Sequence, residues 1–491
     1  MNDSDHAGRL RWPWWAALLV PLCLMACTST TQEPTTQEPT MPEEPHVTEP
    51  VGPSLYLELA SLTGNAVSEA MVRLSSGEQH ADVRGTLLLE KLPVGRQLLQ
   101  VQAEAYYPTL VAFEMAEGVR AGARLKLLPL GVPVATFDAS QGTTVTKGGV
   151  TLTVPPSALL DAQGNPIAGQ VDAFMTALDM KSGELVAAPG ALEGIPAPGA
   201  DPVSLESLGM VALSFQQEGR VIPFARGIRI RGSVPGSIRV GSQGGAGDGP
   251  FRSRRSALSE CLLPSVPSWR LDSESGRWIP TGELGRIEES STAGSFDWEI
   301  TLDDPSGMLN MALPPWWCSP EASADNPLQV PNPPWVESAC LEVRVKDAQG
   351  QPVAGRMVVA QRVGQLGLSL SRAMTDADGL ARLEVRRNKP VQVDAGEGVM
   401  TVSMGSSAGT CRNQGGASTS VTLVVSALAC TPGAARDCRA YGGPQDTSGQ
   451  GVCRAARQSC DVEGSRWSDT CEGEVLPRQE RCDNALDDNC D

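Results

Sequence analysis

Histidine and basic residues are scarce in this 491-residue chain, and their scarcity excludes several classes of function. The three histidines are His6, His46 and His80, and none lies near another in sequence. Zinc hydrolases and Ser/His/Asp or Cys/His enzymes need histidine beside further ligands or a nucleophile, so we expect no such enzyme. Lys and Arg total 39 against 57 Asp and Glu, a net charge of −18, so we expect no nucleic-acid partner.

Long apolar runs at helical spacing are also missing, and Gly 51 and Pro 38 punctuate the chain. Residues 54–130 instead contain short runs of alternating polarity: "LYLELASL", "AMVRLSS", "GTLLLEKL", "RQLLQVQA", "TLVAFEMA" and "ARLKLLPL". A period of two between turn residues is typical of half-buried strands. The sequence therefore predicts an all-β protein of tandem antiparallel β-sandwiches plus a small disulfide-rich C-terminal module.

The first residues have the layout of a secretory signal. Arg9 and Arg11 precede "WPWWAALLVPLCLMA", an apolar run of 15 residues, which is shorter than the about 20 that span a bilayer. The end of this run, Leu24-Met25-Ala26-Cys27, resembles a bacterial lipobox. The resemblance implies that residues 1–26 are a lipoprotein signal peptide and that Cys27 carries the lipid. By resemblance to Gram-negative lipoproteins, Thr28 in place of Asp implies the outer membrane, on its periplasmic face or at the cell surface.

Residues 27–53 are predicted to be a disordered tether. The segment contains "TTQEP" twice, is rich in Pro, Thr and Glu, and holds no Lys or Arg. Such a composition buries too little apolar surface to fold and stays extended. At about 3.1 Å per residue, the tether reaches at most roughly 80 Å.

Residues 54–130 resemble the carboxypeptidase regulatory-like, transthyretin-type sandwich, on the segments Leu92-Pro93-Val94-Gly95 and Ala105-Tyr106-Tyr107-Pro108. The family name implies no peptidase activity here. Residues 339–428 contain a second copy, in which "GQPVAGRMVV" aligns with "GNAVSEAMVR" and "TDADGLARLEV" with "ADVRGTLLLEK". In this copy Asp376, Asp378 and Gly379 could form a calcium loop, but we interpret them as turn residues.

Residues 131–318 are predicted to form a middle β region with a Gly-rich insertion, followed by a Pro-rich linker at 319–338. The stretch "GGVTLTVPPSALLDAQGNPIAGQVDAFMTALD" in this region resembles ZU5-like sandwiches. Five tryptophans lie around the end of the region: Trp269, Trp278, Trp298, Trp316 and Trp317. Exposed and coplanar, they would stack on sugar rings; buried, they would fill a core or hold a domain junction.

Apart from Cys23 and Cys27, the cysteines all lie at or after position 261, and an exported location makes disulfides the default. The domain limits suggest pairing Cys261 with Cys318 and Cys340 with Cys411. The segment 429–491 has the composition of a disulfide scaffold, and its seven cysteines are Cys430, Cys438, Cys453, Cys460, Cys471, Cys482 and Cys490.

The end of the chain resembles the metal-binding modules of large bacterial surface proteins, in which a Cys and an Asp/Asn-rich run close the unit. The resemblance, together with the hard oxygen ligands, suggests calcium as a possible cofactor. The candidate ligands are Asp483, Asp487, Asp488, Asn489 and Asp491.

The leading hypothesis is a lipid-anchored, non-catalytic protein of the outer membrane that serves as a structural or adhesive binding module. Its partners would be the membrane, through the lipid, and an envelope protein or polysaccharide. The alternative is a carbohydrate-binding envelope protein that uses the sandwich faces and the tryptophans. A hydrolase built on two carboxylates would need a cleft with close Asp or Glu side chains, and no catalytic spacing marks one out.

Overall fold

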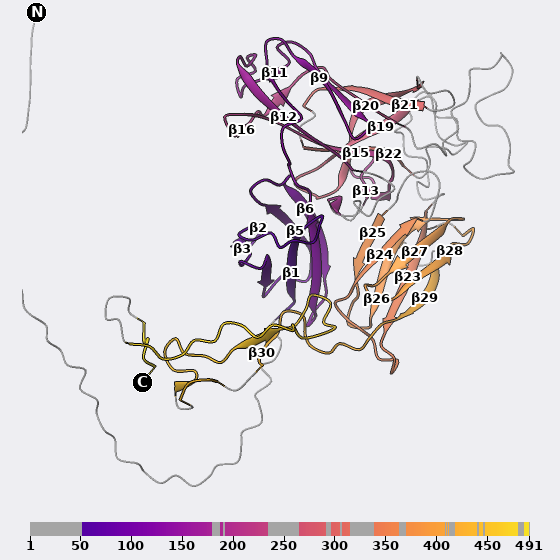
Figure 1. The fold of residues 1–491 in the computed structure, drawn as a ribbon. Coiled ribbons are helices and arrows are strands. Elements are labelled where there is room, and N and C mark those ends of the chain that lie inside the picture. The colour runs from indigo at the N-terminus through magenta and orange to yellow at the C-terminus, as the bar shows by residue number, and fades with distance from the viewer. Residues whose placement is uncertain are drawn as a thin grey trace, which may run out of the picture. The chain divides into compact units, whose positions relative to one another are not determined.

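The elements of the structure are β-strands joined by turns (Figure 1). The computed structural model describes residues 52–178, 187–189, 192–233, 265–290, 296–304, 307–314, 338–362, 370–407, 409, 411, 418–438, 441–444, 447–479 and 486–490. Pro50–Asp491 forms one compact unit. The all-β prediction is confirmed. Within the described ranges, no helix is long and apolar enough to span a membrane.

Several predicted residues lie outside the described ranges, together with residues 1–51 and the Gly-rich insertion at 241–257. They are Cys27, Cys261, Trp316, Trp317, Cys318, Cys482, Asp483 and Asp491.

The first sandwich packs two sheets face to face, with strand orders β4-β1-β7 and β3-β2-β5-β6. Apolar side chains at alternate positions of both sheets meet in one core, which includes Leu57, Leu99 and Phe113. The strands are β1 (Ser54–Ser61), β2 (Met71–Leu74), β3 (Gly77–His80), β4 (Thr86–Leu89), β5 (Gly95–Gln102), β6 (Thr109–Met115) and β7 (Arg120–Leu127).

The second sandwich repeats this topology strand for strand, with orders β26-β23-β29 and β25-β24-β27-β28. In both sandwiches the first and last strands pair in parallel, β1 with β7 and β23 with β29, and the other pairs are antiparallel. The strands are β23 (Ser338–Lys346), β24 (Met357–Arg362), β25 (Leu370–Met374), β26 (Leu380–Arg386), β27 (Pro390–Asp394), β28 (Val399–Ser403) and β29 (Ser418–Val424).

The turn before β4 and the turn before β26 have the same structure in the two copies. The Asp82 Oδ1 accepts hydrogen bonds from the backbone N–H groups of Arg84 and Thr86, at 3.0 and 2.7 Å. The Asp376 Oδ1 accepts them from Asp378 and Leu380, at 3.0 and 2.9 Å. The interpretation of Asp376 and its neighbours as turn residues is confirmed.

The middle region has a 13-stranded sheet, whose main path runs β8-β12-β15-β22-β19-β20-β21-β18-β10-β9, and a separate two-stranded sheet of β11 and β17. Both ends of this path contribute side chains to one core, such as Phe137 of β8 and Leu152 of β10. The strands are β8 (Ala135–Asp138), β9 (Thr143–Lys147), β10 (Val150–Val154), β11 (Leu159–Leu160), β12 (Gln170–Leu178), β13 (Glu193–Gly194), β14 (Val203–Ser204), β15 (Glu206–Gln217), β16 (Arg220–Val221), β17 (Phe224–Ala225), β18 (Ile228–Ser233), β19 (Ser265–Leu271), β20 (Trp278–Glu289), β21 (Phe296–Leu302) and β22 (Gly307–Leu313).

The C-terminal module, described over 430–438, 441–444, 447–479 and 486–490, has little regular structure. Two short strands, β30 (Ala435–Asp437) and β31 (Arg457–Ser459), pair antiparallel as a two-stranded sheet. Three disulfides join Cys430 to Cys460, Cys438 to Cys471 and Cys453 to Cys490. These crosslinks supply the constraint that a core this small does not provide.

We predict that Gly85→Ala and Gly379→Ala destabilise their sandwiches by the same mechanism. Both glycines have a positive φ, and an added Cβ would lie 2.6 Å from the Leu59 carbonyl oxygen or 2.5 Å from that of Val345. We expect each change to lower the free energy of unfolding by more than about 2 kcal/mol in urea denaturation. Gly350→Ala is the matched control, since its φ is also positive and nothing lies within 4 Å of its Cβ. Equal losses in all three variants would contradict the shared packing constraint.

Candidate functional site at the junctions between modules

The tryptophans that the structure describes in the middle region are buried. Trp269 and Trp278 have no exposed surface, and Trp298 is 2% exposed. The Trp269 indole N–H donates a hydrogen bond to the Ala312 carbonyl at 2.9 Å. These three side chains therefore form no exposed row for stacking on sugars, which removes them from the carbohydrate-binding alternative.

Trp269 and Trp278 instead belong to an apolar cluster that joins three modules. We call it the junction cluster; its buried members include Tyr107 and Leu128 from the first sandwich and Leu370 from the second. The Tyr107 hydroxyl donates a hydrogen bond to the Ala212 carbonyl at 3.3 Å, and burial raises the pKa of this phenol. The Leu192 N–H donates to the Leu370 carbonyl at 2.9 Å. Side chains and backbone of distant sequence segments thus share one core.

A buried ion pair fixes the second sandwich to the middle region. The Arg386 Nη1 lies 3.3 Å from the Glu206 Oε2, and the two side chains are 5% and 1% exposed. The Arg386 Nη2 also donates to the carbonyl oxygens of Leu313 and Pro314, at 3.1 and 3.0 Å. A buried arginine needs several such acceptors, because the pair alone does not offset the desolvation of two charges.

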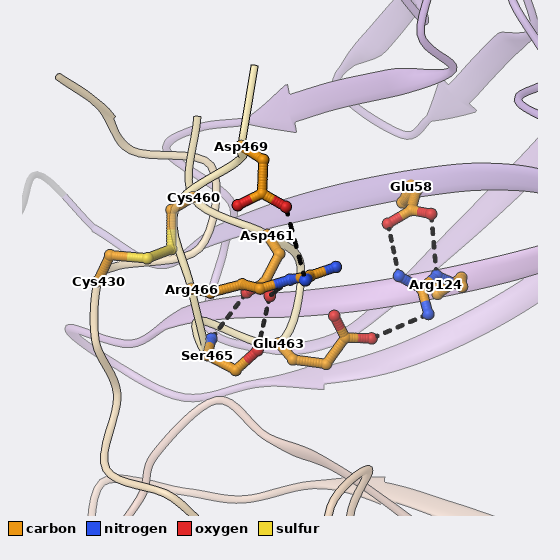
Figure 2. A network of polar contacts seen from close by, with 9 residues as sticks. All are labelled: Glu58, Arg124, Cys430, Cys460, Asp461, Glu463, Ser465, Arg466 and Asp469. Carbon is orange, nitrogen blue, oxygen red and sulfur yellow. Dashed lines mark hydrogen bonds and ion pairs between the residues drawn. A yellow bond between two sulfur atoms is a disulfide. The ribbon is translucent and has the colours of Figure 1, made fainter. Parts of the chain in front are cut away.

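The C-terminal module docks on the outer face of β1 and β7 in the first sandwich (Figure 2). The Arg124 guanidinium donates to both oxygens of Glu58, at 2.9 and 3.0 Å, and its Nη1 lies 3.2 Å from the Glu463 carboxylate. Burial raises the pKa of the Glu463 carboxyl, and Arg124 opposes that rise. Figure 2 shows Arg124 between the two carboxylates, so it links the modules electrostatically.

The backbones of the first sandwich and the C-terminal module also approach each other closely at this contact. A Cβ added to Gly122 of β7 would lie 1.8 Å from the carbonyl oxygen of Val462. The Gly122 N–H also donates to the carbonyl of Gly355 in the second sandwich, at 3.3 Å. Only glycine permits the approach of Val462, and the two contacts together make Gly122 a contact point for three modules.

The docked loop is held by its own crosslink and turn. The Cys430–Cys460 disulfide precedes Asp461, whose carboxylate accepts hydrogen bonds from the N–H and hydroxyl of Ser465, at 2.7 and 2.6 Å. Arg466 lies within 4.0 Å of Asp461 and Asp469, as Figure 2 shows. These contacts preorganise the loop that carries Val462 and Glu463.

In the second sandwich, Cys340 of β23 and Cys411 form a disulfide, which is the pairing that the domain limits suggested. Eight of the candidate cysteines are therefore paired in the described ranges. Disulfides are typical of proteins exported to an oxidising compartment. The proposed partner cysteines Cys261 and Cys318 lie outside these ranges.

The described part of the acidic C-terminal run serves local structure. The Asp487 Oδ1 accepts a hydrogen bond from the Cys490 N–H at 2.6 Å, and the fully buried Asp488 accepts from the Arg478 guanidinium at 2.7 Å. No group of three or more His, Cys, Asp or Glu side chains that could hold a metal occurs among the described residues. Asn489 lies in the same turn. These residues do not by themselves fit calcium, and with Asp483 and Asp491 outside the described ranges, calcium stays a prediction.

A cavity of about 220 Å³ lies where the two sandwiches meet the middle region. Two of its arginines are held in ion pairs: the Arg277 Nε lies 3.3 Å from Glu193, and the Arg382 Nε lies 3.2 Å from Glu342 just beyond the lining. Burial lowers the pKa of Arg372 in the same cavity to about 10. Paired charges of both signs stabilise a contact between modules.

Sequence reasoning did not identify the residues that make these junctions. Arg124 and Gly122 occupy outward positions of an alternating strand, where a polar or small residue is expected in any solvated sheet. Arg386 is the last residue of β26 and Glu206 is the first of β15, and a charged residue is also expected at the end of a strand. The one signal was the gathering of tryptophans, for which a role at a domain junction was among the alternatives.

No family model and no curated protein matches the chain. Among solved structures, it is similar to the major pilin subunit BcpA of Bacillus cereus, at 9% identity, with 76% of this chain and 99% of that chain covered and a TM-score of 0.13. The pilin SpaD of Corynebacterium diphtheriae matches at 10% identity, 76% and 97% coverage, and a TM-score of 0.15. A candidate carbohydrate-binding protein of Bacteroides uniformis matches at 12% identity, with 37% of this chain and 89% of that chain covered and a TM-score of 0.14. At these values the likeness supports no inference about function.

Breaking the buried pair from either side is expected to destabilise the chain strongly. We predict that Arg386→Met or Glu206→Gln lowers the free energy of unfolding by about 3–5 kcal/mol, because each removes the opposite charge from a buried ion pair. The double variant Arg386→Met/Glu206→Leu should recover part of this loss. Arg73→Gln is the matched control, since the Arg73–Glu78 pair is 52% and 41% exposed, and it should cost less than about 1 kcal/mol. Urea denaturation followed by tryptophan fluorescence measures these values; single variants as mild as the control would contradict the role of the pair.

Proposed function

We propose that this protein is a lipid-anchored, non-catalytic protein of the outer membrane that acts as a stiff structural or adhesive module. One observation carries the proposal: the modules meet through buried contacts. The junction cluster and the Arg386–Glu206 pair bury side chains that come from separate modules. A chain built to hold a binding surface at a fixed geometry needs such junctions, whereas independently moving domains have small, polar interfaces.

The anchor rests on the sequence around Cys27. Its resemblance to a lipobox supports lipidation, and the Pro/Thr/Glu tether that follows would hold the folded unit clear of the membrane. The disulfides of the second sandwich and the C-terminal module support an oxidising compartment outside the cytoplasm. Thr28 after Cys27 favours the outer membrane.

We propose an envelope protein as the partner of the anchored module. The described tryptophans of the middle region, which carried the polysaccharide alternative, are in cores and junctions. With Trp269, Trp278 and Trp298 buried, we infer that a sandwich face recognises its partner through strand edges and charged side chains, which suits a protein surface.

The anchor is tested by Cys27→Ser, with Cys23→Ser, inside the predicted signal peptide, as the matched control. In cells fed labelled palmitate, we expect the wild type and Cys23→Ser to carry the label and to fractionate with the outer membrane. Cys27→Ser should lose the label, because no thiol remains to carry the lipid. In-cell crosslinking should join the wild type to another envelope protein.

A labelled Cys27→Ser protein, or an unlabelled and freely released wild type, would contradict the anchor. Crosslinks to peptidoglycan alone would contradict the protein partner.

A further inference from the structure

Arg356 is a buried arginine whose charge has no direct partner in the part of the chain that the structure describes. Its side chain precedes β24 and is 5% exposed, and none of its three guanidinium nitrogens has a hydrogen-bond partner among the described residues. Removing an arginine from water without replacing its hydrogen bonds costs several kcal/mol. Burial of the Arg356 guanidinium at this cost in free energy indicates that another group compensates its charge.

The backbone around Arg356 holds its position firmly. The Arg356 N–H donates to the Thr375 hydroxyl at 2.8 Å, and that hydroxyl donates to the Val353 carbonyl at 2.7 Å. The Thr375 N–H donates back to the Arg356 carbonyl at 2.9 Å. Because Thr375 is itself buried, the turn fixes where the arginine side chain starts.

The guanidinium lines a cavity of about 190 Å³ at the contact of the first sandwich, the second sandwich and the C-terminal module. Lys126 and Arg124 line it from β7, Gly396 from the end of β27, and Glu463 from the C-terminal module. A water molecule occupies about 30 Å³ of liquid volume, so the space admits a small oxyanion with its hydration.

The acidic groups near Arg356 are each engaged elsewhere, and Asp394 in the cavity lining accepts a hydrogen bond from the Gly396 N–H at 2.7 Å. Glu397 accepts a hydrogen bond from the Ser426 N–H at 3.0 Å, Asp461 is held by Ser465, and Glu463 pairs with Arg124. These three carboxylates act on Arg356 through space, and burial still lowers the pKa of its guanidinium. Lys126, half-buried in the lining of the same cavity, adds a second cation that makes no ion pair in the described part of the chain.

We propose that this cavity binds a small oxyanion, a phosphate or carboxylate group, with the Arg356 guanidinium as its main contact and the Lys126 ammonium as its second. The planar guanidinium fork matches two oxygens of either group. An anion held there would touch groups from two sandwiches beside the docked C-terminal loop, so its binding would also stabilise the junction. This site goes beyond the proposed function and does not depend on the lipid anchor.

Isothermal titration calorimetry of the full chain, with its disulfides formed, tests the site. Inorganic phosphate and acetate are titrated in separate arms at constant ionic strength, with chloride as the reference anion. We expect saturable binding with one site per chain in at least one arm, and the arm that binds identifies the ligand class. Arg356→Gln should weaken this binding at least about tenfold, as expected for lost hydrogen bonds to a charged group. Lys126→Gln should weaken it less, and Arg73→Gln, on β2, should leave it unchanged.

Two results would overturn the site: no saturable binding of either anion by the wild type, or unchanged affinity in Arg356→Gln. If Arg356→Gln does not fold, the wild-type titrations and Lys126→Gln test the site instead, since both leave the buried Arg356 unchanged. Arg356→Lys, which keeps the charge and loses the fork, should then bind phosphate more weakly than the wild type.

Discussion

Burial of Trp269 and Trp278 in the junction cluster is the constraint on which the arrangement of the modules depends. A large aromatic side chain buries about 150–250 Å², which at about 25 cal/mol per Å² is an upper bound of about 4–6 kcal/mol for each ring. The exposed ion pairs of the chain contribute about 1 kcal/mol or less each. Arg124, 44% exposed where it contacts Glu463, belongs to this weaker class. Apolar burial therefore dominates the joining of the sandwiches, and the ion pairs select the partner faces.

The duplicated sandwich explains how one chain presents several faces to its neighbours. Both copies keep the same strand order and the same turn, in which Asp82 or Asp376 caps the backbone ahead of a glycine. What differs is the outer surface. The first copy uses Gly122 and Arg124 of β7 to dock the C-terminal module, whereas the second uses Arg386 to reach the middle region. The core and the turn maintain the same fold in both copies, whereas the outer side chains determine which module each sandwich contacts.

The sequence predicts the positions of the strands better than it predicts which strands pair with each other. Alternating polarity locates β1, β2 and β4 to β7, because each places one row of side chains in a core. It misses β3, Gly77–His80, whose side chains are all exposed and therefore carry no hydrophobic period. The parallel pairing of β1 with β7 leaves no local signal either, since register depends on residues far apart in the chain. Domain limits suggested the Cys340–Cys411 disulfide, while the three pairings in the C-terminal module depend on loop paths that composition does not fix. Gly122 and Arg356 look like ordinary turn or surface residues until the modules are brought together.

The most direct test of the buried junctions is differential scanning calorimetry of the full chain. If the junction cluster couples the modules, the two sandwiches and the middle region should unfold in a single endotherm. Trp278→Ala should then split that endotherm, whereas Trp467→Ala, in the C-terminal module, should leave it whole. Separate transitions already present in the wild type, or an endotherm that Trp278→Ala does not divide, would contradict the account.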